Sequence, residues 1–191
     1  MTMRRRELVA GLLGGGLVLG GGAVALTGGP SLSDDDDLSE GNDPIEIEAI
    51  EARGSEPGTL TVPDDEEATV LTFFATTCES CAEKMPHLAE AAATFETEPV
   101  NFISVTSEPV GDNVPESAVV EWFEDHDGDW TVAHDSGSEL SVAYDGIPYP
   151  KTAVVDTEGR VWWEHTGTAT TDELVSGIEG ALEDADEHTD A

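Results

Sequence analysis

The chain of 191 residues is long enough for one compact domain and a tail, and short for two domains with separate cores. It carries 42 acidic side chains against 7 Lys and Arg, a formal net charge of -35, so its surface repels nucleic acids and anionic lipid headgroups. A hydrophobic fraction of 38%, gathered in compact apolar runs, favours a folded protein over an acidic disordered one.

Residues 1–26 have the layout of an export signal. Arg4, Arg5 and Arg6 precede a glycine-rich apolar run that carries no charge from residue 8 to residue 26. Adjacent arginines followed by apolar residues are typical of a twin-arginine signal. If it is left uncut, the run is just long enough to cross a bilayer. We therefore expect the domain to lie outside the cytoplasm, either anchored to the membrane or secreted after cleavage.

The next three segments differ sharply in composition. Residues 27–44, TGGPSLSDDDDLSEGNDP, combine Gly, Pro and Ser with a run of four Asp and predict an acidic disordered linker. Residues 45–52 alternate apolar and charged side chains, and with GTLTV after a Gly-containing turn they predict an N-terminal β-hairpin. ATVLTFFA at 68–75 is apolar and β-branched, which predicts a central strand buried on both faces.

The rest of the chain alternates between predicted helices and strands. We expect strands over 100–107, 130–135, 151–156 and 160–167, and helices from Cys78 through Phe95, over 115–126, over 137–144 and from Thr171 onward. Thr170 and Glu173 can form a capping box at the last helix. This order predicts an α/β fold, a mixed central sheet flanked by helices, in a domain spanning 45–185 and followed by an acidic tail at 186–191.

Cys78 and Cys81 are the two cysteines of the chain, and they follow the buried strand after a short turn. Cys78 stands where the helix begins, so free amide donors and the positive end of the helix dipole stabilise a thiolate there. Cys81 is one helical turn further on, close enough to close a small disulfide ring. The pair therefore favours a redox centre that needs no other cofactor.

Other interpretations of the pair stay open. An inert disulfide is disfavoured because it would close a very short loop, which constrains the unfolded chain little. Copper(I) can be held by two thiolates, sometimes with one histidine, so a copper(I)-binding chaperone is the alternative function. The five histidines are scattered along the chain: His87, His126, His134, His165 and His188. They form no second paired motif, so we predict no structural zinc site.

Three segments carry a resemblance to a known family. LTFFATTCESC at 71–81 resembles the LNFWATWCxPC segment of thioredoxin-fold proteins, Pro86 lies where that family kinks its active-site helix, and IPYPKTAVVDTEGRV resembles the family's cis-proline segment. Over residues 45–185 the chain is similar to the extracytoplasmic TlpA-like and ResA-like thiol-disulfide oxidoreductases. The resemblance implies a thioredoxin fold, with the predicted hairpin as an N-terminal extension, and dithiol chemistry in the direction of reduction.

The resemblance also implies roles for the residues around the pair. Cys78 is the nucleophile that attacks a disulfide of a partner protein, and Cys81 resolves the mixed disulfide that results. Pro150 is the cis-proline, with Pro148 as the alternative register. Together with Tyr149, Pro150 forms the edge that receives the backbone of the partner.

Some positions depart from the family's pattern. Thr77, which we assign to substrate binding, replaces a tryptophan, Ser80 replaces a proline, and Thr72 replaces the buried acid of thioredoxin itself. Glu79 directly follows Cys78, and its carboxylate is expected to tune the pKa of Cys78 upward by opposing the thiolate. These departures bear on partner choice and redox potential rather than on the dithiol chemistry.

Partners follow from the same resemblance. It implies exported proteins with thiols or disulfides as substrates, apocytochrome c among them, a part in cytochrome c maturation, and a membrane electron donor of the CcdA type. We expect a monomer that binds no nucleic acid. The composition, with few lysines and abundant Asp and Glu, resembles that of proteins from extreme halophiles.

The charge imbalance predicts a strong response of stability to salt. Past residue 26 the basic side chains are those of Arg53, Lys84, Lys151 and Arg160, so most carboxylates face other carboxylates. Their mutual repulsion weakens the fold at low ionic strength, where the Debye length is about 30 Å at roughly 0.01 M salt. We expect the melting temperature to rise steeply as sodium or potassium chloride is added in a thermal unfolding series. A flat response would contradict this expectation.

Overall fold

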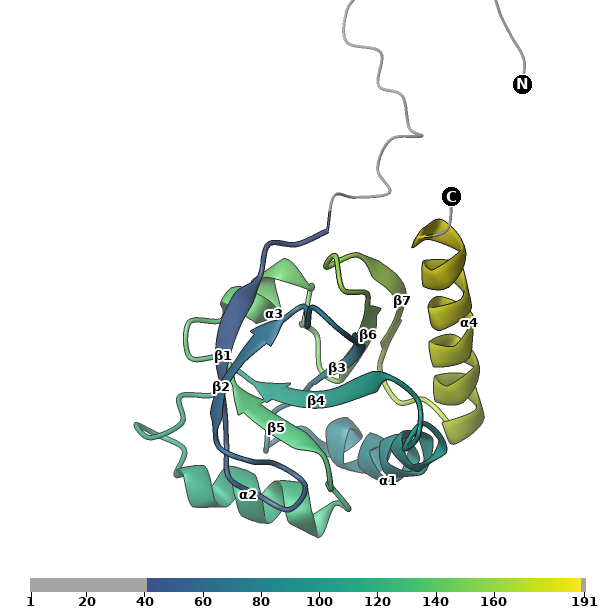
Figure 1. The fold of residues 1–191 in the computed structure, drawn as a ribbon. Helices are drawn as coiled ribbons and strands as arrows, with labels where there is room; N and C mark the ends of the chain where they lie inside the picture. The colour runs from purple at the N-terminus through teal and green to yellow at the C-terminus, as the bar shows by residue number, and fades with distance from the viewer. Residues whose placement is uncertain (1–40, 190–191) are drawn as a thin grey trace, which may run out of the picture. The chain divides into compact units, whose positions relative to one another are not determined.

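The computed structural model describes residues 41–189, which form a sheet flanked by helices (Figure 1). The predicted export signal at 1–26 lies outside this part, as does most of the predicted linker at 27–44. Among the helices of the described part, none combines the length and the apolar composition needed to span a bilayer.

Seven strands and four helices make up the described part. The strands are β1 (Ile45–Ala49), β2 (Gly58–Val62), β3 (Ala68–Phe73), β4 (Val100–Thr106), β5 (Thr131–His134), β6 (Lys151–Val155) and β7 (Val161–Thr166). The helices are α1 (Glu79–Thr94), α2 (Glu116–Asp125), α3 (Glu139–Ala143) and α4 (Thr171–Thr189). Each predicted strand and helix is therefore present.

All seven strands belong to one sheet, in the order β2-β1-β5-β4-β3-β6-β7. β3, β4 and β5 run parallel, whereas β6 and β7 on one side and β1 and β2 on the other pair antiparallel. The prediction of a mixed sheet is confirmed, and so is the N-terminal hairpin, which joins the sheet because β1 pairs with β5.

The central strand β3 is buried on both faces because its side chains alternate between two hydrophobic cores. Val70 and Phe74 belong to one core, and Leu71 and Phe73 belong to the other. Every residue of β3 after Ala68 is buried, as its continuous apolar and β-branched sequence predicted.

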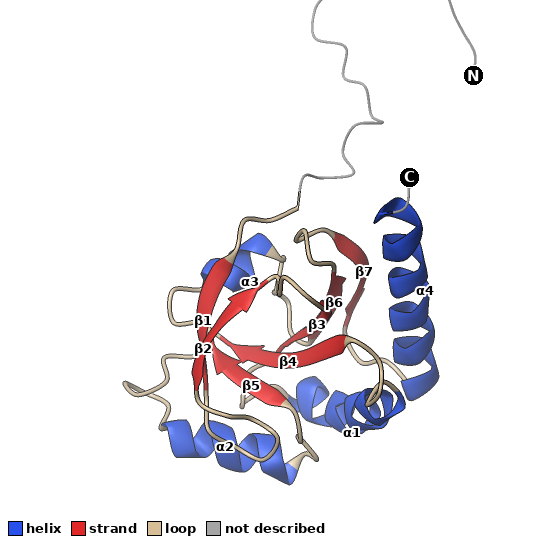
Figure 2. Cartoon of the chain, viewed as in Figure 1, coloured by secondary structure: helices blue, strands red, loops and turns tan. Residues whose placement is uncertain are grey.

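Helices cover both faces of the sheet, and Figure 2 shows α3 on the side opposite α1 and α2. The first core receives buried side chains from three helices: Met85 and Leu88 of α1, Val119 and Phe123 of α2, and Leu174 and Ile178 of α4. The second core is closed by Leu140 of α3 and by Tyr144, directly after it. α1 therefore lies against the sheet with its first turn at the end of β3.

The predicted capping box of α4 is confirmed. The Thr170 amide donates to Glu173 Oε2 at 2.9 Å, and the Glu173 amide donates to Thr170 Oγ1 at 3.4 Å. Hydrogen bonds from the backbone and side chain of Thr170 hold the pKa of the Glu173 carboxyl below its usual range. α4 extends to Thr189, so it includes most of the segment 186–191 that was predicted as a tail.

Candidate active site

The two cysteines form a disulfide at the first turn of α1. β3 ends at Phe73, and a turn through Thr76 and Thr77 leads to Cys78, which is the N-cap residue of the helix. The Cys81 amide donates a hydrogen bond to Cys78 Sγ at 3.1 Å, so this sulfur satisfies one of the donors that a helix start leaves free. The two Cα atoms lie 5.2 Å apart.

The two sulfurs differ in accessibility. Cys78 is half-buried at the surface, whereas Cys81 is only 2% exposed and belongs to the hydrophobic core. Thr77 and Glu79 flank Cys78 and are exposed, and Ser80 Oγ lies 3.5 Å from Cys78 Sγ. A thiol or disulfide that approaches from solvent can therefore contact Cys78. Cys81 is buried and is shielded from such a partner.

The turn before Cys78 is held by Glu108, which follows β4. Its carboxylate accepts hydrogen bonds from the Thr76 amide at 2.7 Å and from Thr76 Oγ1 at 2.9 Å. Thr106 Oγ1 also donates to it, at 3.3 Å. Because β3 and β4 are parallel neighbours, their carboxyl ends meet at one edge of the sheet, and Glu108 ties these two ends together.

The segment before β6 lies beside the same edge. β6 pairs with β3 so that Lys151 faces Phe73, which brings Tyr149 and Pro150 to the strand end from which Cys78 follows. The Tyr149–Pro150 peptide bond is cis, and the Ile147–Pro148 bond is cis as well. Pro150 is buried, whereas Pro148 is exposed.

A hydrogen bond connects this segment to the loop after β4. Tyr149 Oη lies 2.8 Å from Ser107 Oγ, next to the Glu108 that holds the cysteine turn. Tyr149 is half-buried, so its ring borders the site while its hydroxyl fixes the ring to the neighbouring loop. The residues predicted for the site therefore lie at one edge of the sheet, where β3, α1 and β6 position them. They are Cys78, Cys81, Thr77, Glu79, Tyr149 and Pro150.

A buried lysine follows Cys81 by three residues on α1. Lys84 of α1 is 1% exposed, and its Nζ donates to Thr152 Oγ1 of β6 at 2.7 Å. Thr152 Oγ1 is also 3.1 Å from Thr72 Oγ1 of β3, so the three side chains form a polar cluster under the first turns of α1. Burial, together with the positive charge of Lys151, lowers the pKa of Lys84 to about 8.

This lysine weakens the fold at neutral pH. Unfolding returns its pKa to about 10.5, and at about 1.4 kcal/mol per pKa unit the difference of about 2.5 units is worth roughly 3 to 4 kcal/mol. A group whose pKa is lowered in the folded state destabilises the protein while it is charged, that is, below pH 8. The lost stability returns as the pH rises from about 8 toward 10.5. The charge of Lys84 therefore does not stabilise the fold at neutral pH.

Two of the histidines hydrogen-bond to groups other than the two sulfurs. His87 Nδ1 shares a hydrogen bond with Thr171 Oγ1 at 3.1 Å, and His126 Nδ1 with the Trp122 carbonyl at 2.6 Å. Within residues 41–189, no three His, Cys, Asp or Glu side chains are grouped as metal ligands would be.

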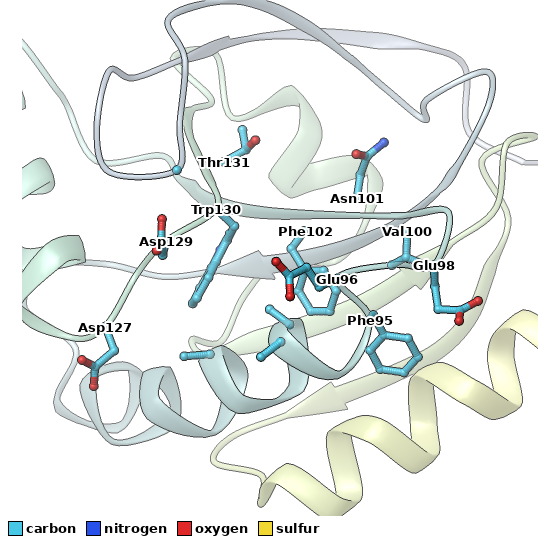
Figure 3. A pocket seen from close by; sticks show the side chains of 14 residues that line it. Phe95, Glu96, Glu98, Val100, Asn101, Phe102, Asp127, Asp129, Trp130 and Thr131 are labelled. Atoms are coloured by element: carbon cyan, nitrogen blue, oxygen red, sulfur yellow. The ribbon is translucent and has the colours of Figure 1, made fainter.

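A surface hollow of about 590 Å³ lies at the far end of α1 from the cysteines (Figure 3). Phe95, Phe102 and Trp130 form its apolar wall. Its charged lining residues are all acidic: Glu96, Glu98, Asp127 and Asp129. α1 is about 24 Å long at 1.5 Å per residue, so this hollow is separate from the disulfide.

Comparison with known proteins identifies the family. The sequence profile of the Redoxin family matches residues 47–182. The chain belongs to the Redoxin family. This Redoxin-family chain is 28% identical over 104 residues to the thiol-disulfide oxidoreductase ResA of Bacillus thuringiensis subsp. konkukian, and 31% identical over 102 residues to that of Bacillus subtilis.

The aligned parts cover 54% and 52% of this chain, and 57% and 53% of these two relatives. The chain therefore spans just over half the length of the curated relatives it matches. Among solved structures, StoA from Bacillus subtilis superposes with a TM-score of 0.59 at 17% identity, over 72% of this chain and 98% of that one. A putative thioredoxin from Neisseria meningitidis gives 0.61 at 18% identity, over 76% and 91%. The predicted thioredoxin fold is thus confirmed.

Glu108 and Lys84 are parts of the site that the sequence did not predict. For Glu108 a signal existed, because it is an acid placed two residues after a buried strand parallel to the one that precedes the cysteines. For Lys84 the signal was its position three residues after Cys81, on the same face of a helix whose other side is acidic.

Proposed function

We propose that this protein is a thiol-disulfide oxidoreductase that reduces disulfides of partner proteins through Cys78 and Cys81. The observation that carries the proposal is the unequal burial of the two sulfurs at the start of α1, beside the edge formed by Tyr149 and Pro150. Such exchange needs one sulfur that a partner can reach and a second that reaches only the first.

The mechanism follows from this arrangement. The Cys78 thiolate attacks a partner disulfide, a bond forms between Cys78 and one partner sulfur, and the other partner sulfur leaves as a thiolate. Cys81 then attacks Cys78 Sγ, which closes the disulfide and releases the second partner sulfur. The amide of Cys81 that donates to Cys78 Sγ favours the thiolate before the attack, as does the helix terminus.

The partner's backbone would lie against Thr77, Tyr149 and Pro150. Thr77 is exposed next to Cys78, and Pro150 carries no amide hydrogen, which leaves the backbone of Tyr149 free to pair with an extended segment. The two curated relatives carry the name thiol-disulfide oxidoreductase, which supports protein disulfides as the substrate class.

The physiological setting that we propose is the cell exterior. Exported proteins, with apocytochrome c among them, would be the substrates in cytochrome c maturation, and a membrane protein of the CcdA type would supply the electrons. The export-signal pattern of residues 1–26 supports this setting. The copper(I)-chaperone alternative would use the same two sulfurs, and in the part of the chain that the structure describes no group of His, Cys, Asp or Glu side chains adds further ligands to them.

A trapping experiment tests the exchange reaction. Cys81→Ser removes the resolving sulfur, so this variant should accumulate a mixed disulfide with a partner or with a model protein disulfide. Dithiothreitol should reduce this mixed disulfide and release the partner. Cys78→Ser is the matched control and should trap little, because its remaining sulfur is buried. Non-reducing electrophoresis and mass spectrometry give the readout. Equal trapping by both variants, or no reduction of insulin by the wild-type protein, would overturn the proposed function.

The reduction potential tests the direction of electron flow. The exposed carboxylate of Glu79 opposes a thiolate at Cys78, and strong oxidants of this fold depend on a stabilised thiolate. We expect a potential below about -200 mV, measured by equilibration against glutathione or dithiothreitol, and a rise in the Glu79→Gln variant. Glu83→Gln, an exposed neighbour on the same helix, should shift it less. A wild-type value above about -150 mV would indicate an oxidase instead.

The location can be tested at the N-terminal arginines. Replacing Arg5 and Arg6 with lysine keeps the charge of the segment but removes the arginine pair, so the precursor should stay in the cytoplasm. Cell fractionation measures the distribution, and Arg4→Lys serves as the control outside the pair. Unchanged export of the double variant would rule out a twin-arginine signal.

A further inference from the structure

The two lysines of the whole sequence, Lys84 and Lys151, are both buried beside the disulfide site. Lys151 Nζ is paired with Glu164 Oε2 of β7 at 2.8 Å. Lys84 has a different environment, since its Nζ donates to the neutral hydroxyl of Thr152 and no carboxylate within the described residues forms an ion pair with it. Within residues 41–189, the ammonium of Lys84 is thus buried without a counter-ion.

Lys84 and Cys81 lie next to each other on α1. They are three residues apart, which puts their Cβ atoms about 5–6 Å from each other on one helix face, and both are buried against the sheet. Long side chains in a helix point back over the preceding turn, so the Lys84 side chain extends over the turn that carries Cys81. Thr152 then fixes the amine between α1 and β6.

In the second step of the proposed reaction, Cys81 must lose a proton that solvent does not readily remove. Cys81 attacks as a thiolate, yet a thiol in apolar surroundings holds its proton tightly. Cys81 is 2% exposed, so water has little access to that proton. An internal base is required, and among the groups around the first turns of α1 the amine of Lys84 is the one that can accept a proton and lies on the buried side.

We propose that Lys84 is the proton partner of Cys81. In the mixed disulfide, the Cys81 thiol transfers its proton to the neutral amine of Lys84, and the resulting thiolate attacks Cys78 Sγ. The Cys78–Cys81 bond forms, the bond between Cys78 and the partner sulfur breaks, and that sulfur leaves with the electron pair and is protonated by solvent. The partner disulfide gains the two electrons that the cysteine pair loses. The inference rests on the proposed function, because it names the base for its second step.

The properties of Lys84 fit this exchange. Its pKa of about 8, below that of an ordinary lysine, leaves a share of the amine neutral near neutral pH and able to accept a proton. An ammonium next to the new thiolate also stabilises it in a buried site. The loss of folding stability that Lys84 causes is then the cost of keeping a base where Cys81 needs one.

Charged groups on the surrounding elements affect the pKa of Lys84. From β6, Lys151 repels the ammonium of Lys84, and its own partner is Glu164 of β7. β3 contributes the neutral Thr72. The titratable groups bordering this region on α1 and α4 line a separate surface hollow: Glu83, His87 and Glu173.

The titration of Cys81 tests the proposal without requiring turnover. In a Cys78→Ser background, the ultraviolet absorbance of the Cys81 thiolate is followed against pH with Lys84 intact and with Lys84→Met. We expect Lys84→Met to raise the pH of half-titration by at least about one unit, that is, to reduce the thiolate fraction at pH 7 about tenfold. Lys151→Met is the matched control and should change it much less. An unchanged titration in Lys84→Met would overturn the proposal.

A kinetic arm separates this proposal from the function on which it rests. With both cysteines present, Lys84→Met should accumulate the mixed disulfide that Cys81→Ser traps, and less of it as the pH rises. If the wild-type protein exchanges with protein disulfides but Lys84→Met accumulates none, the role of Lys84 is wrong and the proposed function stands. If the wild-type protein exchanges with none, the proposed function fails, and the titration still decides whether Lys84 and Cys81 share a proton.

One measurement needs no change at either residue. Carbon-13 labelling at the lysine ε position gives two signals, which Lys151→Arg assigns. The Lys84 signal should titrate differently in the oxidised and reduced proteins, because only the reduced protein has a Cys81 proton to share. The same titration in both redox states would contradict the proposal, even if Lys84→Met failed to fold.

Discussion

The antiparallel pairing of β3 with β6 is the constraint on which the site depends. It sets Phe73 opposite Lys151, so the turn that leads to Cys78 and the segment that ends at Pro150 meet although about seventy residues separate them in the chain. A shift of this register by one residue would reverse every side chain of β6 between the two cores. Packing in the two hydrophobic cores therefore fixes the register of β6 against β3. This register in turn places Tyr149 and Pro150 next to the turn that leads to Cys78.

The same pairing explains where the basic groups are found. Lys151 and Thr152 follow Pro150 directly on β6, and Lys84 reaches Thr152 from α1. In a chain with a net charge of -35, lysines at the surface would have many carboxylates available, yet both are buried here. Burial without a full set of counter-ions lowers folding stability, and we interpret it as the consequence of placing a titrating amine next to a buried sulfur.

Local sequence was sufficient for the elements and for the two cysteines. β3 was predicted because an apolar, β-branched run of this length suits a strand buried on both faces, and the start of α4 because Thr170 and Glu173 cap a helix with their own side chains. The spacing of Cys78 and Cys81 follows from one helical turn. In each case the interacting groups lie within a few residues of one another, so no knowledge of the fold was needed.

The sequence by itself therefore determined an acidic α/β protein with a reactive dithiol at a helix start. Tertiary structure decided which sulfur faces solvent, that Glu108 holds the turn from 32 residues away, and that the amine of Lys84 meets a hydroxyl 68 residues further on. The physical reason is that burial and hydrogen bonding between distant segments depend on strand order and register. These are set by the packing of the whole sheet, whereas periodicity and capping are properties of a single turn or strand.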